Sequence, residues 1–219
     1  VLSMASIPFD KLGGKLWYNG EMVDGDEGRL HILSHGLHYG SCVFEGERAY
    51  GGKIFKHQEH TDRLFKSAEI LGMHIGYSNK ELYDAAYTSL EAQGFTDAYV
   101  RPVAWRGSEM MAISAQQTTT HVAVICWDMG SYFDPEARMA GIKLQWAKYK
   151  RPSPECAPVH AKAAGLYMIC TVSKHEAEAQ GFNDAIMLDW RGYVAECTGA
   201  NIFFVKDGAY GLKMLRVRG

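Results

Sequence analysis

Short stretches of residues that favour β-strands give the first strong pattern along the chain, from residue 16 onward. Asn19-Gly20 separates the β-prone residues 16–18 and 22–23. Because Asn-Gly supplies the positive φ angles of a type I′ turn, this arrangement predicts a β-hairpin. A second hairpin is predicted from residues 42–50 and 53–56, which two glycines join.

Two amphipathic helices are predicted after these hairpins. Apolar residues recur at helical spacing over residues 57–71, with charged residues on the other face, and Gly72 ends the pattern. Ser78 and Glu81 have the spacing of a capping box, so a second helix is predicted from there to Gly94. Helices between β-prone stretches favour a mixed α and β fold.

Residues 98–105 and 121–127 have the composition of strands. The second stretch is almost continuously apolar, which indicates burial on both faces. Pro102 argues against a central position for the first, because proline cannot donate a hydrogen bond to a neighbouring strand.

A stretch rich in Gly, Ser, Asp and Pro at residues 128–138 is the best candidate for a connection between domains. We place the boundary near Asp134, so that residues 1–134 form a small N-terminal α+β domain and residues 135–219 belong to a second domain. The elements predicted in the second part are a strand at 142–146, a Pro-rich loop at 151–158, a helix at 163–180 and strands at 185–188, 193–195 and 202–205.

The composition is that of an ordinary globular protein. The 219 residues are 47% hydrophobic and 22% charged, with a net charge of −2, so neither nucleic acid nor an anionic membrane is expected as a partner. No apolar run approaches the roughly 18 residues of a membrane span and no signal pattern is visible, so we expect a cytoplasmic protein. The five cysteines are widely spaced, which favours buried thiols over a disulfide framework.

Lys162 and Glu196 are the first candidates for chemistry. Small residues surround Lys162, where the Pro-rich loop gives way to the predicted helix. A cation is disfavoured at a helix N-terminus, so this place favours the neutral amine that Schiff-base chemistry requires. Glu196 closes a predicted strand before a turn of small residues, where a carboxylate can face a cleft and hold a protonated pyridine nitrogen.

Two long segments resemble a known family. The first, residues 161–167, reads AKAAGLY and is followed by GFNDAIMLDWRGYVAECTGANIFFV. This region is similar to the signature of the class IV (fold type IV) pyridoxal-phosphate aminotransferases. The second reads SHGLHYGSCVFEGERAYGGKIFKHQEHTDRLFKSAEILGM and resembles their N-terminal region in the branched-chain amino-acid aminotransferases. The match in order and spacing covers about residues 17–207.

The resemblance implies a role for four residues at pyridoxal 5′-phosphate. Lys162 matches the Schiff-base lysine, which also carries the proton between the substrate Cα and the cofactor. Glu196 matches the residue that holds the pyridinium nitrogen, and Tyr167 the residue that hydrogen-bonds the phenolic oxygen. Arg63 matches the phosphate-binding residue, a task that suits a planar guanidinium.

Four more residues match the substrate pocket of branched-chain enzymes. They are Tyr39, Phe44, Tyr99 and Arg101. Aromatic walls suit the side chains of Leu, Ile and Val, while Arg101 and the tyrosine hydroxyls suit the γ-carboxylate of glutamate. For Phe44 and Tyr99, packing in the core is an almost equal alternative.

The histidine-rich segment needs a test for a metal site. His31, His35 and His38 are spaced as H-x3-H-x2-H, and His57 and His60 follow. Glycines interrupt the run, so one element does not bring three imidazoles to one side, and we expect no metal.

By this resemblance the fold is α+β, with a small N-terminal domain, a larger domain that binds pyridoxal phosphate, and the cofactor between them. The implied reaction is transamination between branched-chain L-amino acids and 2-oxoglutarate, giving branched 2-oxo acids and L-glutamate, by a homodimer or larger assembly. A D-amino-acid transaminase and an aminodeoxychorismate lyase are the alternatives within the family.

The C-terminal sequence departs from the family. Members continue well past the position of Val205, and turns of the Gly-Ile-Thr and Gly-Thr-Ala types complete their phosphate cup. Neither turn has a counterpart here, and the resemblance ends after Gly208. The larger domain is therefore expected to be incomplete, and an inactive truncated remnant is the alternative to an active enzyme.

Overall fold

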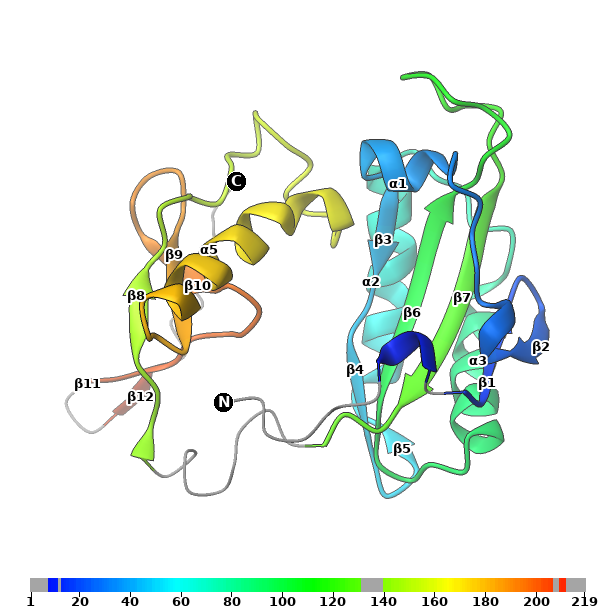
Figure 1. Ribbon diagram of the computed structural model, residues 1–219, viewed down its shortest axis with the longest axis horizontal. Helices are drawn as coiled ribbons and strands as arrows, with labels where there is room; N and C mark the ends of the chain where they lie inside the picture. The colour runs from blue at the N-terminus through cyan, green and yellow to red at the C-terminus, as the bar shows by residue number, and fades with distance from the viewer. Residues whose placement is uncertain (1–7, 12, 131–139, 207–208, 212–219) are drawn as a thin grey trace. The chain divides into compact units, whose positions relative to one another are not determined.

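The computed structural model describes residues 8–11, 13–130, 140–206 and 209–211. Contacts within the chain divide it into two compact units (Figure 1). Unit 1 comprises residues 1–130 and 161–165, and unit 2 comprises residues 131–160 and 166–219. The boundary predicted near Asp134 lies outside the described residues. Residues 161–165, which follow that boundary in the sequence, belong to unit 1 by their contacts.

Unit 1 is built on a seven-stranded antiparallel sheet. Its strand order is β2-β1-β7-β6-β4-β5, and β3 pairs with β6. The strands are β1 (Lys15–Tyr18), β2 (Glu21–Asp24), β3 (Cys42–Phe44), β4 (Glu47–Tyr50), β5 (Lys53–Ile54), β6 (Ala98–Arg106) and β7 (Thr120–Trp127). The β1–β2 hairpin is confirmed, with Asn19 and Gly20 at φ 49° and 98°. The second predicted hairpin is β4–β5, because residues 42–50 form two strands and not one.

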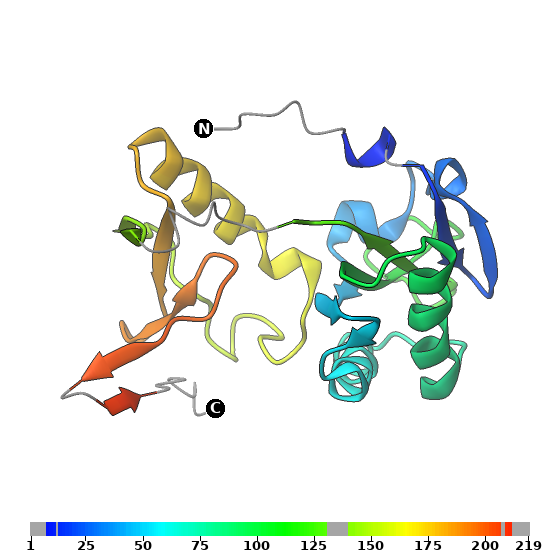
Figure 2. The same cartoon turned by 90° about the horizontal axis from the view of Figure 1, so that it is seen from below.

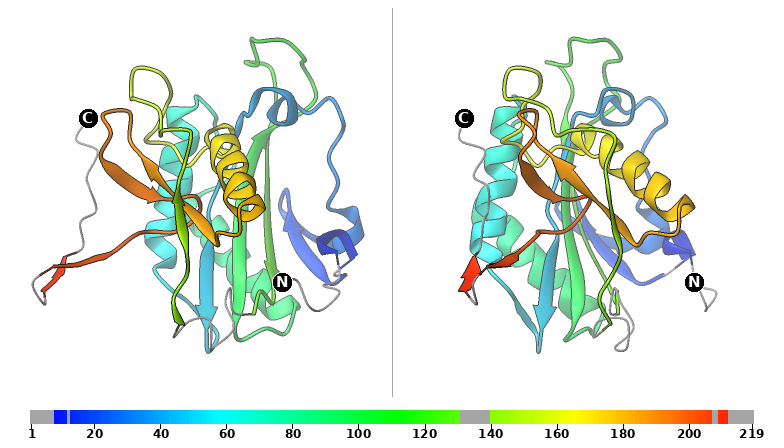
Figure 3. Two further views of the ribbon diagram at one scale, coloured as in Figure 1. Left: turned by 60° about the vertical axis from the view of Figure 1, so that its left-hand side comes forward. Right: turned by 90° about the vertical axis from the view of Figure 1, so that its left-hand side faces the viewer.

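Helices cover one face of this sheet. Figure 3 shows α2 (His57–Ile70) and α3 (Asn79–Ala92) packed side by side against it. Both helices are confirmed, and the Ser78–Glu81 capping box is formed. The short helix α1 (His35–Tyr39) was not predicted, since its segment is broken by glycine. Two short 3₁₀ helices, η1 and η2, span Phe9–Lys11 and Gly25–Glu27.

The expectation that Pro102 keeps its strand from the centre of the sheet is wrong. Strand β6 pairs with β7 along one side and with β3 and β4 along the other. The Pro102 carbonyl accepts a hydrogen bond from the Glu45 N–H (2.9 Å), in the break between β3 and β4. Since the N and C=O of one residue face the same side of a strand, the missing N–H of Pro102 faces this break, where no ladder bond is required.

Side chains alternate between the two faces of β6. Val100 and Ala104 are fully buried on one face of the strand, and α2 and α3 pack against β6. Tyr99, Arg101 and Val103 take the positions between them and therefore lie on the opposite face. This opposite face is the one that carries the candidate substrate residues of β6.

Among the described residues of unit 2, helix α5 packs on a three-stranded sheet. The sheet order is β10-β9-β8, with β8 parallel to β9 and β10 antiparallel to it. Helix α5 packs on β9 (Figure 2). The elements are β8 (Leu144–Trp146), α5 (Met168–Ala179), β9 (Asp184–Leu188), β10 (Val194–Cys197), and the separate pair β11 (Phe204–Lys206) and β12 (Ala209–Gly211). A 3₁₀ turn, η3 (Ala164–Leu166), begins within the segment 161–165 of unit 1. The helix predicted from residue 163 starts only at Met168, and most of the divergent C-terminal sequence lies outside the described residues.

The two units together have the mixed α and β content of the predicted α+β class. None of the helices within the described ranges is long and apolar enough to cross a membrane.

Candidate active site

Lys162 lies in a segment that is joined to unit 1 through its backbone. Its N–H donates to Ser67 Oγ on α2 (2.9 Å), and its carbonyl accepts from the Phe44 N–H of β3 (3.2 Å). The next residue, Ala163, forms an antiparallel bridge with Val43. Residues 161–165 thus extend the edge of the sheet beside β3, and the lysine is held by bonds that do not involve its side chain.

The expectation that Lys162 stands at a helix N-terminus is wrong. Only the three-residue turn η3 follows it, and α5 starts six residues later at Met168. A dipole argument therefore does not apply to its amine, because the helix dipole acts only within the first turn. The small neighbours that suggested a helix, Ala161 and Ala163, are buried against unit 1 instead.

Phe44, Tyr99 and Arg101 are brought together with Lys162. The Lys162 Nζ is 5.0 Å from the centroid of the Phe44 ring. The Arg101 guanidinium carbon lies 4.5 Å from that same centroid, and Arg101 Nη2 donates to the Tyr99 hydroxyl (2.8 Å). Strands β3 and β6 and the segment of Lys162 thus place an amine and a guanidinium at one aromatic ring, and that guanidinium binds a phenol.

Arg101 carries a hydrogen-bond donor that none of the described residues accepts. Its Nε is buried and has no hydrogen-bond partner within the ranges that the structure describes. An unsatisfied donor on a charged group costs free energy, which an acceptor such as a carboxylate recovers. The group therefore fits the binding of an anionic substrate.

Gly46 makes room for Tyr99. A Cβ atom on Gly46 would lie 2.1 Å from the Tyr99 hydroxyl oxygen, which is closer than atoms approach. Glycine at the break between β3 and β4 is therefore what lets the Tyr99 hydroxyl reach Arg101.

Replacing Gly46 by alanine is expected to displace the Tyr99 ring and break its hydrogen bond to Arg101. A hydrogen bond to a charged group is worth about 1.5–3 kcal/mol, so we expect about a tenfold or larger rise in KM for an anionic substrate. Steady-state kinetics measure this, with Gly51→Ala as a glycine control that lies in the β4–β5 turn. An unchanged KM would contradict the packing argument.

Tyr39 is not brought to this cluster. It ends α1, is 45% exposed, and packs on His35 with 4.6 Å between ring centroids. Its predicted place in the substrate pocket stays a prediction.

Arg63 is paired with a buried carboxylate. On α2, its Nε and Nη2 donate to the two oxygens of Glu45, each at 2.6 Å. His60 Nδ1 lies 2.7 Å from Glu45 Oε2. The predicted phosphate-binding residue thus has one edge of its guanidinium fixed by the protein.

Glu196 and Tyr167 lie in unit 2, where both contact Arg151. Arg151 Nε is 3.2 Å from Glu196 Oε1, and its guanidinium carbon is 5.9 Å from the centroid of the Tyr167 ring. A bulge between Val194 and Glu196 interrupts the β9–β10 pairing. Bulges often re-aim a side chain beside a functional site. Arg151 was missed by sequence reasoning, since nothing in the Pro-rich loop distinguishes it.

The histidines of the candidate metal run have separate partners. His35 is bonded to Ser41 Oγ and to the Ala112 carbonyl, and His38 to the Ile32 carbonyl. In the part of the chain that the structure describes, no three His, Cys, Asp or Glu side chains are grouped as metal ligands.

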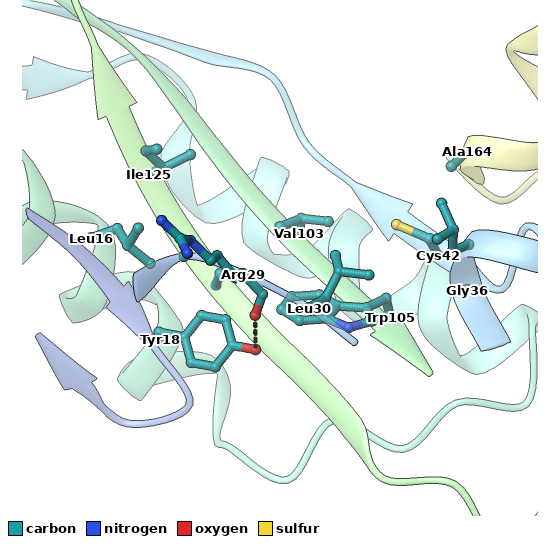
Figure 4. A pocket seen from close by; sticks show the side chains of 13 residues that line it. Leu16, Tyr18, Arg29, Leu30, Gly36, Cys42, Val103, Trp105, Ile125 and Ala164 are labelled. Carbon is teal, nitrogen blue, oxygen red and sulfur yellow. Dashed lines mark hydrogen bonds between the residues drawn. The ribbon is translucent and has the colours of Figure 1, made fainter. Parts of the chain in front are cut away.

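An apolar pocket of about 370 Å³ is lined by Val103 and Trp105 of β6 (Figure 4). Since side chains alternate along a strand, the pocket opens on the same sheet face as Tyr99 and Arg101. At one end the Tyr18 hydroxyl donates to the Arg29 carbonyl (3.3 Å). Burial raises the pKa of the Cys42 thiol in this pocket to about 11, although Arg101 acts in the opposite direction, so the thiol is protonated at neutral pH. The pocket is lined by Leu16, Tyr18, Gly28, Arg29, Leu30, Gly36, Leu37, Cys42, Val103, Trp105, Ala123, Ile125 and Ala164.

Comparison with known proteins identifies the family. The profile of the family described as "Amino-transferase class IV" matches residues 42–212. The chain belongs to the class IV aminotransferase family. The matched range contains Lys162, Tyr167 and Glu196 and the β3–β4 region, and the roles of these residues stay predictions.

Relatives of this class IV aminotransferase are named as branched-chain enzymes. This chain is 41% identical, over 93% of its length, to a probable branched-chain-amino-acid aminotransferase of Rickettsia felis, and covers 69% of that protein. It is 41% identical over 89% of its length to a branched-chain-amino-acid aminotransferase of Pseudomonas aeruginosa, covering 65% of it.

Solved structures of aminotransferases have the same fold. The Escherichia coli branched-chain amino-acid aminotransferase matches with a TM-score of 0.85 at 34% identity, over 90% of this chain and 67% of that one. An aminotransferase from Brucella abortus, bound to the cofactor PLP, matches with a TM-score of 0.77 at 30% identity, over 90% of this chain and 70% of that one. The class IV aminotransferase described here thus spans about two thirds of the length of its relatives.

Proposed function

We propose that this chain is a pyridoxal-phosphate-dependent branched-chain amino-acid aminotransferase. It moves the amino group between Leu, Ile or Val and 2-oxoglutarate, giving branched 2-oxo acids and L-glutamate. The observation that carries the proposal is the amine of Lys162 beside Phe44, with Arg101 at the same ring and Tyr99 bonded to Arg101. Relatives 41% identical that are named for this reaction support it.

The chemistry of the candidate residues fits the cofactor. Pyridoxal phosphate, when bound, supplies an electron sink for the charge that develops at the substrate Cα. Lys162 provides the amine that bonds the cofactor and then carries the proton away from Cα. The Glu196 carboxylate holds the proton of the ring nitrogen, the Tyr167 phenol donates to the phenolic oxygen, and Arg63 binds the phosphate.

The candidate substrate residues of unit 1 suit both an apolar and an acidic substrate side chain. Phe44 and the Tyr99 ring supply apolar surface for a branched side chain. Arg101, whose buried Nε has no partner within the described ranges, and the Tyr99 hydroxyl bind the γ-carboxylate of glutamate. Tyr39 completes this set in the proposal. One pocket thus accepts an apolar side chain in one half-reaction and an acidic one in the other.

We also propose that the enzyme is a homodimer or a larger homo-oligomer. Large apolar side chains are exposed around α1, next to the pocket of Figure 4. Large apolar side chains left exposed within one short segment are typical of a protein interface. The residues concerned are Leu30, Ile32, Leu33 and Leu37.

The substrate assay tests the proposal. The purified protein, supplied with pyridoxal phosphate and 2-oxoglutarate, is expected to form glutamate with L-leucine, L-isoleucine or L-valine. D-alanine and aminodeoxychorismate serve as controls for the two other activities of the family. Turnover of either control without turnover of L-leucine, or no turnover at all, would overturn the proposed reaction.

A further inference from the structure

Glu45 is a fully buried carboxylate that α2 holds on both oxygens. Arg63 donates to Oε1 and Oε2 from two nitrogens at 2.6 Å, and His60 Nδ1 lies 2.7 Å from Oε2. Burial alone would raise the pKa of this carboxyl, but the hydrogen bonds and charges of Arg63 and His60 outweigh it and hold the pKa below its usual range. Glu45 is therefore an anion with a fixed position.

The backbone around Glu45 is fixed as well. Its own N–H donates to the Pro102 carbonyl of β6 (2.9 Å), and the N–H of the preceding residue, Phe44, donates to the Lys162 carbonyl (3.2 Å). The Glu45 side chain thus connects Arg63 to the backbone of residues 44–45, and Phe44 in that segment also binds Lys162. These contacts fix the two residues with proposed roles at the cofactor relative to each other within unit 1.

A guanidinium needs such a fixed partner to bind a phosphate well. The Arg63 side chain is 52% exposed, and a long exposed side chain loses rotamer freedom when it is ordered on a ligand. The two parallel hydrogen bonds to Glu45 set the plane of the guanidinium before any ligand arrives. The Arg63 side chain therefore loses its rotamer freedom when the protein folds, and less entropy is lost when the phosphate binds.

We propose that Glu45 is the positioning residue for Arg63, and that it sets the affinity of the protein for the phosphate group of its cofactor. This inference rests on the proposed function, in which Arg63 binds that phosphate. Glu45 contacts Arg63 in this account and does not itself touch the cofactor.

The test compares binding of pyridoxal 5′-phosphate with binding of pyridoxal, which has no phosphate. For Glu45→Gln we expect about a tenfold loss of affinity for pyridoxal phosphate, as for a lost charge-assisted hydrogen bond, and an unchanged affinity for pyridoxal. Absorbance titration measures both, at a temperature below the melting of each variant. A purely structural role for Glu45 would lower both affinities equally.

Glu47→Gln is the matched control. Glu47 is also a buried carboxylate bonded to a histidine of α2, but the histidine in its case is His57. The ratio of the two affinities is expected to stay at the wild-type value in this variant. Glu45→Asp, which keeps the charge but draws it back by one methylene, gives a second variant with the same expected selective loss.

A double-variant cycle completes the test. In an Arg63→Lys background, Glu45→Gln is expected to cause no further loss of affinity for pyridoxal phosphate, because the geometry it maintains is already gone. An unchanged ratio in Glu45→Gln, or losses that simply add in the cycle, would overturn the inference. If the wild-type protein binds neither pyridoxal phosphate nor pyridoxal, the proposed function itself fails, and the inference with it.

Discussion

Replacing Lys162 by alanine is expected to lower kcat for amino transfer from L-leucine by about 10²–10⁴-fold or more. The reason is that a positioned group which moves a proton contributes a factor of this size, and Lys162 also bonds the cofactor in the proposed reaction. The fold is expected to survive, since the hydrogen bonds of Lys162 to Ser67 and Phe44 use its backbone N–H and C=O, which alanine keeps. A glutamate-forming assay and circular dichroism measure the two effects.

Lys66→Ala is the control for this loss. Lys66 is an exposed lysine of α2 that pairs with Glu69 at 2.8 Å, on the same unit as Lys162. Its removal is expected to leave kcat unchanged, because exposed pairs of this kind contribute little. A Lys162→Ala variant that kept the wild-type rate would remove the basis for its catalytic role.

Replacing Glu47 by alanine is expected to lower the free energy of unfolding by about 3 kcal/mol, since removing one partner of a buried ion pair leaves the other unpaired. Glu47 and His57 are both buried, and His57 Nδ1 lies 2.7 Å from Glu47 Oε2. The usual loss is about 3–5 kcal/mol. We expect the lower end because Glu47 Oε1 has no hydrogen-bond partner among the described residues, so its removal breaks no bond there. Urea unfolding, followed by tryptophan fluorescence, measures the change.

The charge state of His57 follows from its two partners. Its Nε2 bonds the Tyr83 carbonyl at 3.0 Å and its Nδ1 bonds a carboxylate, so both ring nitrogens donate and the imidazole is protonated. Burial lowers the pKa of His57, but the hydrogen bond and charge of Glu47 and the bond to Tyr83 outweigh this effect and raise it above its ordinary value.

This shift gives the stability a definite pH dependence. A histidine whose pKa is raised on folding contributes stability that is fully present below its unfolded pKa of about 6.5 and is lost as the pH rises through the folded value. The difference in unfolding free energy between the wild type and His57→Gln is therefore expected to be largest near pH 6 and to shrink at higher pH. A difference that grows as the pH rises would show that His57 is neutral in the folded state.

The sequence predicted correctly the turn and the helix start that depend on a few neighbouring residues. The Asn19-Gly20 turn and the Ser78–Glu81 capping box each lie within a few residues, and both are formed as expected. The errors concern contacts between distant segments. Pro102 is tolerated in a central strand only because of the break at Glu45, and the small residues around Lys162 pair with β3 where a helix was expected.

The candidate site follows the same division. Lys162, Tyr167, Glu196 and Arg63 were predicted from a resemblance that extends over two long segments. Arg151, which contacts Glu196 and Tyr167 from the Pro-rich loop, has no pattern around it that the sequence reveals. The pairing of Glu45 with Arg63 joins residues 18 positions apart, across the end of a strand and a helix, and only the structure brings it to light.

In the proposed reaction, Lys162 forms the covalent bond to the cofactor. The most direct test is to incubate the wild-type protein with pyridoxal 5′-phosphate, reduce it with sodium borohydride, and locate the attached group by mass spectrometry of its peptides. We expect one phosphopyridoxyl group in the wild-type protein, on Lys162, and none in Lys162→Ala. Attachment to another lysine, or no attachment to the wild-type protein, would contradict it.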